Sequence, residues 1–225
     1  MRRAIFIIVA VIAVSSAVAI LAIALIQITQ AEMPKWALAR ASGVVSYLLL
    51  WLATVLGILV SHPDSHSWNW ANLATRLRLH IGFAVFAIVF TLLHIVVLAT
   101  DEYAKVGWLG AFLPMAAEYR PVPITLGVLA FWGMVLASLT ASLANTRAFR
   151  KSWLPIHRIS LAFFVLAWVH GLFSGSDSLN LLALYLTTGV FVVTLATWRY
   201  AAPSIARRRK TFARRTQTEF KRGSK

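Results

Sequence analysis

Long apolar stretches separated by short polar clusters dominate this chain. A helix needs roughly 20 apolar residues, at about 1.5 Å each, to cross about 30 Å of hydrocarbon. Six stretches meet that length, over residues 4–28, 39–60, 79–99, 122–143, 154–173 and 179–198. Breakers such as Pro34, Pro63 and Pro121 lie between them. The pattern predicts an all-α integral membrane protein, built as a six-transmembrane-helix bundle.

The first stretch has a second interpretation. Met1-Arg2-Arg3 and the apolar run after it also fit a secretory signal peptide cleaved near Ala19. The apolar region of a signal spans about 7 to 15 residues, whereas this one continues to Ile28, so we expect an uncleaved helix. Residues 1–200 then form one transmembrane domain, and residues 201–225 a basic tail too short to fold alone.

Composition narrows the chemistry. Hydrophobic residues make up 60% of the chain and the mean hydropathy is +0.76, which excludes an ordinary water-soluble domain. The chain has no cysteine. Disulfides, iron–sulfur clusters, covalently attached c-type haem and thiol nucleophiles are therefore excluded, and any redox cofactor must be held by other ligands.

The net charge of +15 would suggest a nucleic-acid partner for a soluble chain, but here we expect it to orient the helices. With a cytoplasmic N-terminus, the inner segments collect all of the 22 Lys and Arg except Lys35, Arg40, Lys105 and Arg120. The outer loops receive all but two of the seven acidic residues. This segregation predicts a multi-pass protein of the cell (plasma or inner) membrane with both termini in the cytoplasm.

Four of the six histidines lie within two of the predicted spans. A single buried histidine is more often a satisfied packing residue, but four in a pattern indicate chemistry. Both spans run outward, so His80 and His157 lie near the cytoplasmic end, and His94 and His170 lie about 20 Å deeper. Two layers of paired imidazoles result. Imidazoles from facing helices can bind a b-type haem without covalent attachment.

Helical geometry supports one pair better than the other. From His80 to His94 the 14 residues fall about 40° short of four turns, which leaves both on one face. From His157 to His170 the 13 residues miss by about 140°. The second pair therefore needs local over- or underwinding, helix tilt or side-chain reach to face a common partner.

The stretches "LHIGFAVFAIVFTLLH" and "IHRISLAFFVLAWVH" resemble the haem helices of the ferric reductase-like transmembrane family, and Arg40-Ala41-Ser42-Gly43 is also similar to that family. The family includes ferric reductases, NADPH oxidases and the small haem subunits of methionine sulfoxide reductase systems. The resemblance covers roughly residues 36–200. It implies two haems, one ligated by His80 and His157 and one by His94 and His170. The uneven spacing of 14 and 13 residues is itself a feature of the family.

The best-known members of that family carry a cytoplasmic flavin- and nicotinamide-binding domain after the last span. This chain stops at Lys225 and has no Gly-rich nucleotide loop. We therefore expect an electron-transfer subunit that needs a donor partner, either a flavoprotein reductase carrying FMN or FAD, a quinol, or a flavin bound at the membrane. Electrons would pass to an acceptor on the outer side.

Haem propionates need cationic partners, and Arg158 at the inner layer and Arg40 at the outer layer are the first candidates, ahead of Arg76 and Arg78. Ordinary topology-setting charge is the alternative interpretation. His62 and His66 have a spacing that could bind a metal on a helix, but Pro63 indicates a turn, so we expect solvated loop histidines.

The basic tail suits anionic lipid, with docking of an acidic donor as the second interpretation. Glycines within the spans predict close packing between helices, and Gly82 could also leave room for a porphyrin. A small transporter or scaffolding protein is the alternative function. A proton-coupled carrier usually places carboxylates in mid-membrane, and none of the seven acids lies in a predicted span, which favours electron transfer.

Overall fold

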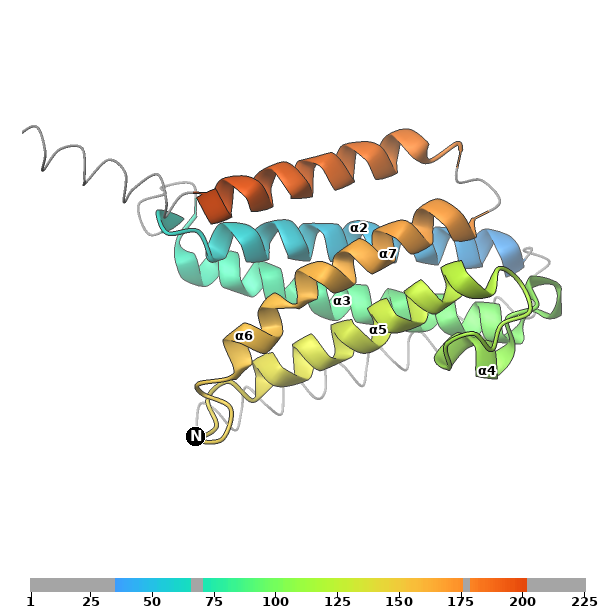
Figure 1. The fold of residues 1–225 in the computed structure, drawn as a ribbon, viewed down its shortest axis with the longest axis horizontal. Helices are drawn as coiled ribbons and strands as arrows, with labels where there is room; N and C mark the ends of the chain where they lie inside the picture. Colours follow the sequence, from blue (N-terminus) through green and yellow to red (C-terminus); the bar gives the residue numbers. More distant parts are fainter. Residues whose placement is uncertain (1–34, 66–70, 176–178, 202–225) are drawn as a thin grey trace, which may run out of the picture.

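A computed structural model describes residues 35–65, 71–175 and 179–201 (Figure 1). These residues are helical apart from turns and short connections, and no strand occurs among them. The elements are α2 (Lys35–Val60), α3 (Leu73–Thr100), the short 3₁₀ turn η2 (Glu102–Ala104), α4 (Gly107–Phe112), α5 (Pro121–Ser142), α6 (Trp153–Arg158), α7 (Ser160–Ser174) and a C-terminal helix, Leu182–Ala201.

Five of the six predicted spans are confirmed as helices long and apolar enough to cross a membrane, with α6 and α7 together forming one of them. α3 begins at Leu73, earlier than the hydrophobic pattern predicts, because the side chain of Asn72 accepts a hydrogen bond from the backbone N–H of Thr75. The stretch over residues 4–28 lies outside the described residues. The sixth span and the position of the termini therefore stay predictions.

The helices form two antiparallel hairpins, α2 with α3 and α5 with α6 and α7 (Figure 1). A cation at the start of the first helix of each hairpin closes it at the same end. Lys35 Nζ donates to the carbonyl of Thr100 (3.2 Å), and an Arg120 guanidinium N–H donates to the carbonyl of Phe173 (2.7 Å). A cation there also stabilises the negative end of the helix dipole.

The C-terminal helix packs across α2 and α7. The hydroxyls of Tyr47 and Thr188 are hydrogen-bonded (2.5 Å), and the indole N–H of Trp51 donates to the carbonyl of Thr188 (3.2 Å). From α7, the indole N–H of Trp168 donates to the carbonyl of Tyr185 (2.8 Å). These bonds satisfy polar groups in an apolar setting, so they fix the register of the C-terminal helix against the two hairpins.

A break at Ile159 separates α6 from α7. Ile159 has φ −64° and ψ −18°, which are 3₁₀ values, and its N–H donates to the carbonyl of Ile156, three residues earlier. The N–H of Ala162 in turn donates to Ile159 (2.8 Å). A 3₁₀ turn advances about 120° per residue instead of about 100°. The chain between His157 and His170 is therefore overwound, which is one of the alternatives that helical geometry left open.

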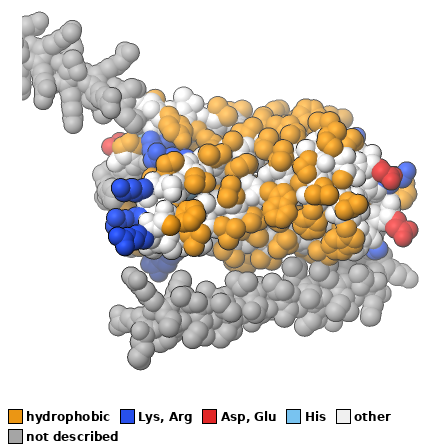
Figure 2. Space-filling view, turned by 60° about the horizontal axis from the view of Figure 1, so that its bottom comes forward, with side chains coloured by type: hydrophobic (Ala, Val, Ile, Leu, Met, Phe, Trp, Pro, Cys, Tyr) orange, Lys and Arg blue, Asp and Glu red, His pale blue; other side chains and the backbone are white. Residues whose placement is uncertain are grey.

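A belt of hydrophobic side chains encircles the helices between one end rich in Lys and Arg and another where acidic side chains lie (Figure 2). Large apolar side chains such as Val190 and Val193 are 64% and 63% exposed on this belt. Such exposure is unfavourable in water and normal against lipid tails. The protein is therefore a multi-pass membrane protein, as its hydrophobic pattern predicts.

Candidate functional site

His80 on α3 and His157 on α6 lie beside each other across the gap between the two hairpins. Both side chains are half-buried. Their ring centroids are 6.0 Å apart and the ring planes are nearly perpendicular, at 86°. The structure therefore brings together the two histidines that share the basic end of their helices.

His94 and His170 form a second pair toward the opposite end of α3 and α7. Each is half-buried, and the two lie within electrostatic range of each other. Along α3, the 14 residues from His80 to His94 correspond to about 21 Å. Two histidine layers at different depths are thus present in the described structure.

The four imidazoles share one hydrogen-bonding pattern. Each Nδ1 contacts a backbone carbonyl on the first helix of its own hairpin. The acceptors are Ala53 for His80 (2.7 Å), Ala39 for His94 (2.7 Å), Ala137 for His157 (3.1 Å) and Pro123 for His170 (2.8 Å). A carbonyl can only accept, so each Nδ1 carries the proton and each neutral ring presents its lone pair at Nε2.

A second contact reaches one of these rings. The hydroxyl oxygen of Ser174 lies 2.9 Å from His170 Nδ1, beside the carbonyl of Pro123. His170 is therefore held by both α5 and its own helix.

The residues of each layer fit a haem. Metal-bound histidines usually donate their second ring N–H to a carbonyl or carboxylate, as all four do here. Two imidazoles bonded through Nε2 at about 2 Å to one metal would hold their centroids roughly 6 Å apart, and the His80–His157 separation is 6.0 Å. A porphyrin brings four nitrogens of its own, so two protein ligands complete the iron.

Glycines on the first helices pack against these rings. A Cβ built on Gly57 would meet the ring of His80, one on Gly43 that of His94, and one on Gly127 that of His170. Helix-interior glycine costs about 1 kcal/mol relative to alanine, so such positions need a packing reason. Close packing is thus confirmed there, but Gly82 is different because a Cβ on it would meet nothing within 4 Å.

The candidate arginines lie next to the histidine layers in sequence. Arg158 follows His157 and is exposed on α6. Arg40 follows Ala39, the acceptor for His94, and its guanidinium lies over the ring of Trp36 at 6.0 Å. Neither position conflicts with a role beside an anionic group.

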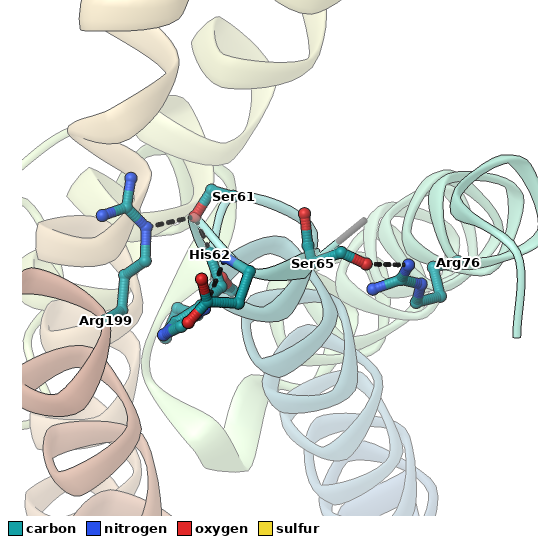
Figure 3. Close-up of polar contacts among 7 residues, drawn as sticks. Ser61, His62, Ser65, Arg76 and Arg199 are labelled. Atoms are coloured by element: carbon teal, nitrogen blue, oxygen red, sulfur yellow. Dashed lines mark hydrogen bonds and ion pairs between the residues drawn. The ribbon is translucent and has the colours of Figure 1, made fainter. Parts of the chain in front are cut away.

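The two other arginines at the basic end differ from each other. Arg76 is buried, and its guanidinium donates to the carbonyl of Ser65 in the α2–α3 connection (Figure 3). Arg78 is exposed and donates to the carbonyl of Ala74 in its own helix (3.3 Å). Arg76 therefore has a structural role at the start of α3.

The prediction that His62 is solvated is wrong. Its side chain is buried, and its ring stacks on Trp198 of the C-terminal helix with centroids 3.9 Å apart. Next to it, Arg199 Nε donates to the hydroxyl of Ser61 at 3.2 Å (Figure 3). Burial lowers the pKa of His62, Asp64 opposes this effect, and Arg199 adds to it. His66 lies outside the described residues, which hold no group of three metal-ligating side chains.

Residues 34–177 match a family model described as Domain of unknown function (DUF8596). The chain belongs to that family. The matched segment runs from the start of α2 to the end of α7, so the family's shared region is the two hairpins with all four histidines. Comparison with curated proteins and with solved structures found no match.

Sequence reasoning found the four histidines and missed what holds them. A backbone carbonyl leaves no trace in residue identity, so the acceptors could not be predicted. The glycines did leave one. Gly43 and Gly57 are 14 residues apart, the same spacing as His80 and His94, as expected when two antiparallel helices pair in register.

Proposed function

We propose that the protein is a membrane cytochrome that binds two b-type haems, one between His80 and His157 and one between His94 and His170. The observation that supports this most is the geometry of the His80–His157 pair. Their centroids are 6.0 Å apart while both Nδ1–H groups are hydrogen-bonded to carbonyls, so both Nε2 lone pairs are available to one metal.

When bound, haem iron supplies a one-electron Fe(III)/Fe(II) couple. The residues of the chain hold that iron on both sides, keep each imidazole neutral and oriented, and surround it with apolar helices that exclude water. Two layers about 21 Å apart along α3 place one electron carrier nearer each membrane face. This arrangement suits transfer across the bilayer rather than within one leaflet.

The donor in this proposal is a separate partner on the cytoplasmic side, a flavoprotein reductase with FMN or FAD or a quinol, and the acceptor lies on the outer side. The basic end of the bundle supports this direction, because by the positive-inside rule it faces the cytoplasm. The resemblance to the ferric reductase-like transmembrane family agrees with it. Six spans and two cytoplasmic termini complete the proposed topology.

Arg158 and Arg40 are the proposed partners of the haem propionates. Each adjoins, in sequence, a residue of the layer that it would serve, His157 for Arg158 and Ala39 for Arg40. A guanidinium forms bidentate hydrogen bonds to a carboxylate, which suits this task.

The test is the reduced-minus-oxidised absorption spectrum of the full chain purified from cells supplied with haem. We expect a Soret band with b-type features, and complete extraction of the pigment by acid-acetone. A chain without a Soret band would instead support a transporter or scaffold. A pigment that resists extraction would contradict non-covalent haem.

The direction of transfer is tested in proteoliposomes. NADH or NADPH alone should not reduce the haem, whereas addition of a flavoprotein reductase or a quinol should. Reduction by the nicotinamide alone would contradict the need for a partner. An acceptor that is reduced only from the basic side would contradict outward transfer.

A further inference from the structure

Three glycines approach the histidine rings more closely than a side chain could. A Cβ on Gly127 would lie 2.7 Å from Cε1 of His170, and one on Gly43 would lie 2.9 Å from Cε1 of His94. For Gly57 and His80 the corresponding distance is 3.1 Å. Contacts this short force the ring to shift, most strongly at His170.

The same glycines stand in one register with the hydrogen-bond acceptors. Gly57 follows Ala53 by four residues, and the pairs Ala39 and Gly43, and Pro123 and Gly127, repeat that spacing. In an α-helix the carbonyl of one residue is bonded to the N–H four residues later. The glycine therefore lies beside the carbonyl that the imidazole reaches, where a side chain would block the approach.

We propose that Gly43, Gly57 and Gly127 are positioning residues that let His94, His80 and His170 donate Nδ1–H to the facing helix. Each carbonyl fixes the tautomer and the plane of its ring, so that the Nε2 lone pair points to the opposite hairpin. The role in haem binding rests on the proposed function, whereas the hydrogen bond and the tautomer are properties of the chain alone.

Two other glycines provide matched controls. Gly82 also lies inside a helix, but a Cβ there would meet nothing within 4 Å. Gly133 packs against an aromatic ring instead, since a Cβ there would lie 2.1 Å from the Phe163 side chain. Gly82→Ala therefore tests the loss of glycine itself, and Gly133→Ala tests a steric clash away from the histidines.

The first experiment needs no haem. The full chain is labelled with ¹⁵N-histidine, and the ring resonances are assigned with single histidine variants. In Gly127→Ala, we expect His170 to lose its hydrogen-bonded Nδ1–H signal, while Gly82→Ala and Gly133→Ala leave it in place. A His170 signal unchanged in folded Gly127→Ala would overturn the proposal.

The second experiment uses the haem-loaded protein and the low-spin EPR signals, which depend on the angle between axial imidazole planes. Gly43→Ala and Gly127→Ala, on different helices, should shift the signal of the same outer haem, and Gly57→Ala only that of the inner haem. Equal shifts in both haems, or none, would overturn the proposal. If no haem binds, the proposed function fails, and the histidine tautomers still decide on the glycines.

Discussion

In the α2–α3 hairpin both histidines lie on one unbroken helix, whereas in the other hairpin the break at Ile159 separates His157 from His170. The spacing is 14 residues in the first and 13 in the second. Both hairpins still direct each imidazole to a carbonyl of the preceding helix. The comparison teaches that the depth and the hydrogen bond of each ring are preserved, while the helix between the rings can vary.

The hairpins also differ in how tightly they hold their rings. The His157 hydrogen bond to Ala137 is the longest of the four, at 3.1 Å, and the residue four positions after Ala137 is Ala141 rather than glycine. His157 also lies on the short helix α6, directly before the break. We infer that the inner layer is held more loosely on the α6 side than on the α3 side.

The largest effect should come from changing the spacing of the histidines. One alanine inserted after Val89 in α3 turns the two ends of that helix by about 100° relative to each other. One of its two histidines then leaves its carbonyl, so we expect loss of at least one haem. An alanine inserted after Ile159 restores a spacing of 14, and the existing break can absorb it.

Haem content per chain, from the Soret band and the protein concentration, measures the difference between these insertions. The α3 insertion should retain less haem than the Ile159 insertion. Equal losses, or the reverse order, would contradict the idea that the break makes the second hairpin tolerant.

A smaller effect concerns His62, which joins the α2–α3 connection to the C-terminal helix. Its folded pKa is lowered by burial, so the unfolded chain binds the proton first as the pH falls. The stabilisation is complete above the unfolded pKa of about 6.5 and decreases below it, by at most about 1.4 kcal/mol per pH unit.

Thermal unfolding in detergent from pH 7.5 to 5 measures this effect. The protein should lose stability toward acid pH, and His62→Phe, which keeps a ring against Trp198, should lose less of it. The same acid sensitivity in His62→Phe would assign the effect to other groups.

The smallest effect should come from the cations that close each hairpin. Arg120→Met and Lys35→Met each remove a charge from helix-end carbonyls, worth about 0.3–1 kcal/mol. Arg120 should matter more, since it contacts the carbonyls of both Phe173 (2.7 Å) and Gly175 (3.4 Å). Melting temperatures compared with the exposed control Lys151→Met test this. A larger loss in Lys35→Met would reverse the predicted order.

Five spans and the depth of the four histidines could be predicted because hydrophobic length and helix rise follow directly from residue identity. The burial of His62 could not, because Trp198, which covers it, lies more than 130 residues away in sequence. The break at Ile159 was only one of several possibilities, since the 13-residue spacing requires an adjustment without saying which. The glycine spacing was visible in the sequence, but its meaning required the carbonyls.

The most direct test of the two-layer account is the set of spectra from the four single variants His80→Ala, His94→Ala, His157→Ala and His170→Ala. The account predicts two classes: His80→Ala and His157→Ala lose the same inner haem, and His94→Ala and His170→Ala lose the same outer one. Circular dichroism confirms that each variant is folded. Different residual spectra within a pair, in folded protein, would contradict the pairing of the two hairpins.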